Sequence, residues 1–220
     1  SNGFLVKILS GVPFNHPFGE AFAPFDAGNG VAAFYTSNAG DGSIVRINIK
    51  AGGHFTFDRI ATGFAVNHGA PGSILGPSGL QYDARHDRLY IVDGTNNTVV
   101  ELCHVSTIPA GGVSVNANGV SFSGPFRHRA FLVYHGAPLN GPISSALLPN
   151  GNLVIGNTLD PNGKNLMVEI TSKGRLLFVR NVDTGVSGAI FGMIATGTND
   201  YNTKLYFNDD NANAVQVLTH

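Results

Sequence analysis

The 220-residue sequence is short of several residue types, and each shortage excludes a class of protein. It contains no tryptophan, two methionines, only 12% charged residues and a single cysteine, Cys103. One cysteine cannot form an intramolecular disulfide. No apolar run approaches the ~18–20 residues of a membrane-spanning helix. We therefore expect neither a disulfide-stabilised domain nor a membrane protein.

The sequence also has no excess of positive or negative charge. Lysine and arginine together number 13, aspartate and glutamate 14, and the formal net charge is −1. The positive residues form no cluster along the sequence. Because binding to nucleic acid requires a lysine- and arginine-rich surface, we expect no nucleic-acid partner.

What the sequence does contain favours an all-β fold. It has 29 glycines in 220 residues, about twice the usual share of ~7%. Short β-branched and aromatic runs alternate with turns rich in Gly, Asn and Asp, and no long Ala-, Glu-, Lys- or Leu-rich segment predicts an amphipathic helix.

Repetition is the strongest pattern in the chain. Residues 76–102, GPSGLQYDARHDRLYIVDGTNNTVVEL, predict three short strands separated by tight turns. The second and third strands recur with their turn, and the copies are 34–47, 89–102, 153–170 and 205–218. The first strand recurs at 17–24, 77–83, 142–149 and 190–197. A fourth strand is expected after three of the units, at 54–60, 130–134 and 175–181.

Units of four antiparallel strands, at intervals a little above the ~40–50 residues of a propeller blade, predict one β-propeller domain over residues 1–220. The predicted blades cover 17–60, 77–134 (with an insertion at 106–126), 142–181 and 190–218. The fourth unit stops after its third strand, and the apolar run 4–9, FLVKIL, is expected to supply its outer strand. A second arrangement stays open. In this arrangement the chain, which begins at Ser1 as a processed or partial product would, is part of a larger, six-bladed ring.

The turn and third strand of the best unit, DGTNNTVVEL at 93–102, carry a family resemblance. They resemble the NHL repeat and the blades of six-bladed SMP-30-like and streptogramin-lyase-like propellers; the other units match more loosely. Propellers of this kind include metal-dependent lactonases, lyases and binding scaffolds. The resemblance therefore implies a fold and does not select an activity.

The turns between second and third strands predict a polar face. In a four-stranded meander these turns open on the same face as the links between blades. Each turn follows a polar residue at the strand end, and these residues are Asn38, Asp93, Asn157 and Asp209. Their oxygens suit the binding of a ligand, or of Ca²⁺ or Mg²⁺. The alternative is that Asn and Asp serve only to stabilise the turns.

Three of the links between blades also contain a histidine: His16, His68 and His135. If these imidazoles converge on the ring axis, they can hold Zn²⁺ with one position open for water. Some NHL-like lyases are similar in this respect. A solvated loop histidine is the alternative at each position.

Two further metal ligands follow from the resemblance alone. Glu20 in PFGEAFAP is similar to the glutamate ligand of SMP-30 lactonases, and Asn140, before Gly141, to an asparagine ligand. No residue matches the remaining aspartate of that family. A lactonase site would therefore be incomplete.

Three functions remain open. The leading hypothesis is a secreted or periplasmic NHL-like propeller that binds a small ligand or a protein partner through the Asn/Asp/His face, and the low charge and Asn/Gly-rich turns favour this localisation. The second is a hydrolase or lyase that uses water on a Zn, Ca or Mg ion. The third is a structural subunit that completes a ring with another chain.

Overall fold

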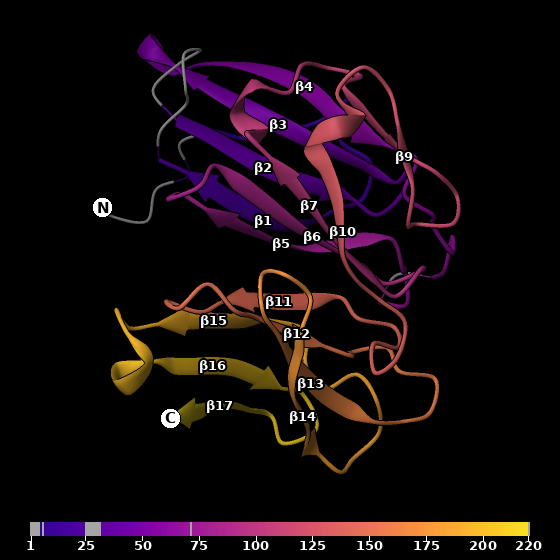
Figure 1. Cartoon of the computed structure of the whole chain (residues 1–220), viewed down its shortest axis with the longest axis vertical. Coiled ribbons are helices and arrows are strands. Elements are labelled where there is room, and N and C mark those ends of the chain that lie inside the picture. The colour runs from indigo at the N-terminus through magenta and orange to yellow at the C-terminus, as the bar shows by residue number, and fades with distance from the viewer. Residues whose placement is uncertain (1–4, 6, 25–31, 71, 220) are drawn as a thin grey trace.

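The computed structural model describes residues 5, 7–24, 32–70 and 72–219. Its strands form four antiparallel sheets in a ring, the arrangement of a four-bladed β-propeller (Figure 1). The all-β propeller fold expected from the repeat is thereby confirmed. The first strands of successive blades lie side by side, with contacts from β1 to β5, from β5 to β11 and from β11 to β15.

The strands lie close to their expected positions. Blade A contains β1 (Pro17–Ala23), β2 (Ala32–Asn38), β3 (Ser43–Lys50) and β4 (His54–Thr62). Blade B contains β5 (Pro77–Asp83), β6 (Arg88–Asp93), β7 (Thr98–Cys103) and β10 (Ala130–His135). Blade C contains β11 (Ser144–Leu147), β12 (Leu153–Gly156), β13 (Asn165–Ile170) and β14 (Leu176–Asp183). The described strands of blade D are β15 (Met193–Thr196), β16 (Lys204–Asp209) and β17 (Ala214–Thr219).

The insertion in blade B forms a hairpin of β8 (Val113–Val115) and β9 (Phe122–Ser123). Strand β8 pairs in parallel with β4, so the hairpin extends the sheet of blade A and ties the two blades together. The described helices are short 3₁₀ turns: η1 (Ala51–Gly53), η2 (Val105–Thr107), η3 (Arg127–Arg129) and η4 (Asp200–Asn202). In this part of the chain no helix has the length and apolar character needed to cross a bilayer.

The core is divided among the interfaces between blades. Within a strand, successive side chains point to opposite faces of the sheet. On β6, Leu89 and Ile91 therefore pack into the cluster shared by blades A and B, whereas Tyr90 and Val92 pack into the cluster shared with blade C. A third cluster, which includes Phe207, joins blades C and D. Among the described residues, no cluster joins blade D to blade A.

Small residues allow the first strands to approach one another closely at the hub. A Cβ atom on Gly19 of β1 would lie 1.8 Å from the carbonyl oxygen of Ser78 on β5. The Ser37 hydroxyl bridges the same two strands, since it accepts from the Gly19 N–H at 2.8 Å and donates to the Ser78 carbonyl at 2.8 Å. Between blades B and C, the Gln81 amide donates to the Ser145 carbonyl at 2.8 Å.

The expected outer strand at 4–9 is not found on blade D. Phe4 and Val6 lie outside the described residues, and Leu5 and residues 7–9 have no strand geometry. The following segment is instead anchored to blade A, because the Asn38 side chain donates to the Pro13 carbonyl at 2.8 Å and accepts from the Asn15 N–H at 3.2 Å. Figure 1 places β3 and β4 of blade A at the opposite end of the molecule from β17. The described residues Leu9 and Ser10 likewise lie beside blade A.

Candidate functional site

The three histidines expected at a metal site do not converge. His16 and His68 are exposed in the links before β1 and β5, and His135 is exposed at the end of β10. The His16 ring shares a hydrogen bond with the Asn15 side chain at 2.9 Å. Among the residues that the structure describes, no group of three or more His, Cys, Asp or Glu side chains is placed to hold a metal ion. Each of the three is a loop or strand-end histidine.

Glu20 and Asn140 also lie apart from such a group. Glu20 is exposed on β1, where it lines a hollow at the ring axis. Asn140 is half-buried in the link before β11, and its amide donates to the Asp160 carboxylate at 2.7 Å. Asp160 also accepts from the Asn162 N–H at 2.8 Å. In this structure Asn140 therefore stabilises a loop, and its predicted role as a metal ligand gains no support.

The four strand-end residues predicted to bind a ligand are almost completely buried: Asn38, Asp93, Asn157 and Asp209. The two asparagines hold the links between blades, since Asn38 donates to the Pro13 carbonyl at 2.8 Å and Asn157 to the Pro138 carbonyl at 2.7 Å. The link and the turn do share one face, as expected. The amide groups are occupied in joining the two, however, and do not face solvent.

The two aspartates stabilise their own turns. Asp93 accepts from the Thr95 N–H at 3.0 Å and from the Asn96 amide at 3.0 Å, and Asp209 accepts from the Ala212 N–H at 3.0 Å. Burial raises the pKa of the Asp93 carboxyl, although the hydrogen bonds from Asn96 and Thr95 act in the opposite direction. These positions follow the turn-stabilising alternative. A ligand at this face would meet other side chains.

The hollow at the ring axis is small and has both polar and apolar residues in its lining. It has a volume of about 320 Å³ and is lined by residues from all four first strands, among them Glu20, Phe22, Leu147 and Ile194. The polar group of Gln81 is already engaged with blade C, because its side-chain oxygen accepts from the Leu147 N–H at 3.2 Å. Glu20 alone supplies a charge. This arrangement provides neither a paired acid and base nor a nucleophile.

A second hollow, of about 770 Å³, opens between blades B and C beside Glu101, Cys103 and Lys173. Burial raises the pKa of the Glu101 carboxyl, and the nearby Arg88 guanidinium, 3.4 Å away, opposes this effect. Burial, and then the charge of Glu101, raise the pKa of the Cys103 thiol. A thiol kept protonated in this way is a poor nucleophile.

The open edge of blade D is the feature with the clearest binding chemistry. In blades A, B and C the third strand pairs with a fourth, whereas β17 pairs only with β16 among the described strands. Val215 and Val217 of β17 are 75% and 48% exposed. The sequence of β17, AVQVLT, has neither a charge nor a proline. Natural sheet edges usually carry such features to prevent pairing with another chain.

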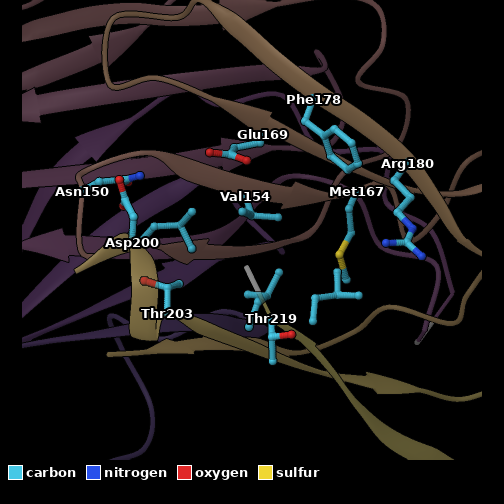
Figure 2. A pocket seen from close by; sticks show the side chains of 12 residues that line it. Asn150, Val154, Met167, Glu169, Phe178, Arg180, Asp200, Thr203 and Thr219 are labelled. Carbon is cyan, nitrogen blue, oxygen red and sulfur yellow. The ribbon is translucent and has the colours of Figure 1, made fainter. Parts of the chain in front are cut away.

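Beside this edge lies a wedge-shaped hollow of about 460 Å³ between blades C and D (Figure 2). Its centre is apolar, with Met167 and the half-exposed ring of Phe178. Asp200 lies at one end and Arg180 at the other, as Figure 2 shows. Glu169 also lines the wedge and accepts a hydrogen bond from Asn152 at 2.8 Å. A fourth strand on β17 would direct alternate side chains into this space.

Sequence reasoning missed this site, although a signal was present. The fourth unit ends after its third strand, and that strand alternates without a charged residue. The assignment of residues 4–9 to the edge concealed the signal. Only the structure shows that, among the described strands, β17 pairs with β16 alone.

Comparisons with known proteins support the fold and nothing finer. No protein-family model matches the chain, and no curated protein sequence does. One similar solved structure is a structural-genomics protein of unknown function from Bacteroides thetaiotaomicron VPI-5482, with a TM-score of 0.52 and 14% identity. The match covers 94% of this chain and 42% of that one, so the chain spans less than half the length of its neighbour. At this identity the likeness extends to the β-propeller architecture alone.

Proposed function

We propose that this propeller is a polypeptide-binding module, and that a separate partner chain adds an extended strand to β17. The observation that carries the proposal is that β17 pairs only with β16 among the described strands, whereas the third strands of blades A, B and C each pair with a fourth. A strand added there forms main-chain hydrogen bonds along the edge and completes the blade. The partner-binding and ring-completing hypotheses from the sequence thereby become a single function at one site.

The chemistry of the edge supports this function. The outer strand β14 carries the charged residue Arg180, which disfavours the addition of a further strand, whereas the edge of β4 is already paired with β8. β17 carries no charged residue, and its exposed valines offer an apolar surface to the incoming strand. The wedge next to it supplies a pocket for alternate side chains, which is how strand-adding domains obtain specificity.

Synthetic strand peptides test the proposal. We would titrate the protein into fluorescein-labelled heptapeptides of sequence TKTVTET and TETVTKT, whose threonines and valine favour extended structure. Saturable binding to the protein is expected in fluorescence anisotropy. Val217→Lys, which places a charge on the edge, should abolish it. Val12→Lys is the matched control, because Val12 is 93% exposed in the segment before β1, which is anchored to blade A.

Two results would overturn the proposal. One is the absence of saturable binding for both peptides; the other is binding that Val217→Lys leaves unchanged. Sedimentation velocity adds a third test. Self-association that Val217→Lys abolishes would assign the edge to a second copy of this chain and exclude a separate partner.

The hypothesis of a metal-dependent hydrolase or lyase stays a prediction, and the arrangement of His16, His68, His135, Glu20 and Asn140 does not favour it. Elemental analysis of the native protein tests it independently. Stoichiometric metal that is lost in Glu20→Ala or His16→Ala would restore it.

A further inference from the structure

The two ends of the wedge carry opposite charges, and an added strand would run from one end to the other. Asp200 is exposed at one end, and the half-buried Glu169 stands opposite Phe178 in the β13–β14 pairing, toward the centre. Arg180 is exposed at the other end. Within the described residues Arg180 has no carboxylate partner, whereas Arg46, Arg59 and Arg88 do. Its charge is therefore available to a ligand.

The direction of the incoming strand follows from the contacts at each end of β17. Asn211, just before β17, donates to the Val186 carbonyl at 2.8 Å, which places the start of β17 beside the chain that follows β14. Thr219, at the end of β17, pairs with Lys204, two residues beyond η4 and close to Asp200. In blades A, B and C the third and fourth strands are antiparallel. A guest strand in the fourth position thus enters at Asp200 and leaves near Arg180.

We infer that blade D selects a strand with a basic residue, an apolar residue and an acidic residue at successive inward positions, in that order from the N-terminus. This inference rests on the proposed function and names the partner's chemistry. The first inward side chain meets the carboxylate of Asp200. The second meets the apolar centre at Met167 and Phe178. The third meets the guanidinium of Arg180, which binds a carboxylate with two parallel hydrogen bonds.

The two heptapeptides were designed for this comparison. TKTVTET and TETVTKT have the same composition, length and net charge and differ only in the order of the inward residues. The expected ratio of dissociation constants is about fivefold in favour of TKTVTET at low salt, because each exposed ion pair contributes only modestly. At ~0.5 M salt the ratio should approach one, since screening removes most of the interaction between exposed charges.

Arg180→Gln provides the discriminating variant. It should weaken TKTVTET, which loses an ion pair, and strengthen TETVTKT, which loses a repulsion, so the two affinities move in opposite directions. A variant that had merely lost its structure would weaken both, and circular dichroism monitors the fold. Equal affinities in the unmodified protein, or a preference for TETVTKT, would overturn the charge order while leaving strand binding intact. Failure of both peptides to bind removes the proposed function itself.

Discussion

The close approach of β1 and β5 at the hub leads to a graded prediction for three glycines that share one position in the repeat. Gly19, Gly79 and Gly192 stand in the first strands, or just before them, of blades A, B and D. A Cβ on Gly19 would lie 1.8 Å from a backbone oxygen of blade B. On Gly79 it would lie 2.7 Å from the Ser145 hydroxyl and 3.0 Å from a backbone oxygen. On Gly192 its nearest neighbour is the Asn208 side chain, at 3.1 Å.

The expected magnitudes follow from what has to move. In Gly19→Ala the clash is with rigid backbone, and overpacking of this kind costs roughly 1–3 kcal/mol. Separating the strands also weakens the two hydrogen bonds of Ser37, each contributing about 1 kcal/mol. We expect Gly19→Ala to lower the free energy of unfolding by about 3–4 kcal/mol, a large part of the ~5–15 kcal/mol typical of a domain. Gly79→Ala should cost about 2 kcal/mol, because the nearest neighbour of the added Cβ is a side chain that can move.

Gly192→Ala is the matched control, since only a flexible side chain has to yield there, and we expect a loss below about 1 kcal/mol. Urea unfolding, followed by the fluorescence of the tyrosines and by circular dichroism, gives the three values from the midpoint and the slope. The order Gly19, Gly79, Gly192 is the prediction. Three equal losses, or a smaller loss for Gly19→Ala than for Gly192→Ala, would refute the close contact between blades at the hub.

Three shorter predictions concern titratable side chains. Burial raises the pKa of Asp58, but hydrogen bonds from Arg46 at 2.8 Å and from its neighbours outweigh burial and hold the pKa below its usual value. The ionised form of Asp58 thus stabilises the fold above the unfolded pKa of ~3.9, and this contribution is lost as the pH falls through the folded pKa. In urea unfolding, Asp58→Asn should therefore lose less stability on acidification than the unmodified protein. Burial raises the pKa of Asp93, so the contribution of its carboxyl to stability grows as the pH falls. Calorimetry at neutral pH should give Asp93→Asn a free energy of unfolding within about 1 kcal/mol of the unmodified protein. Asp93→Ala leaves turn N–H groups without an acceptor and should lower the free energy of unfolding by about 2 kcal/mol. Burial and the Glu101 charge raise the pKa of Cys103, so iodoacetamide should alkylate its thiol more slowly than a free thiol at pH 8. Glu101→Gln should increase the alkylation rate, which mass spectrometry measures. Equal rates in Glu101→Gln and in the unmodified protein would contradict the role of the Glu101 charge.

The architecture was predictable because the sequence repeats local rules that do not depend on distant contacts. Residues of β6 and β7 alternate between two buried faces, and the turn between them has the Asp and Asn that a tight turn needs. Such patterns locate strands and turns wherever they occur. Asp93 also illustrates the limit of the method, because a residue type that suits a turn equally suits an exposed binding face. Only burial distinguishes the two roles.

By itself, the sequence determined that the chain folds into four-stranded antiparallel units around a hub, since strand alternation, turn chemistry and small hub residues are local and repeated. The tertiary structure alone decided which polar groups remain free and which edge stays open. The three histidines and Glu20 could be placed on loops and strands from the sequence, but their separation depends on how the blades pack. The anchoring of the segment before β1 to blade A is likewise a contact between distant residues, and the pairing of β17 with β16 alone among the described strands is visible only in the structure.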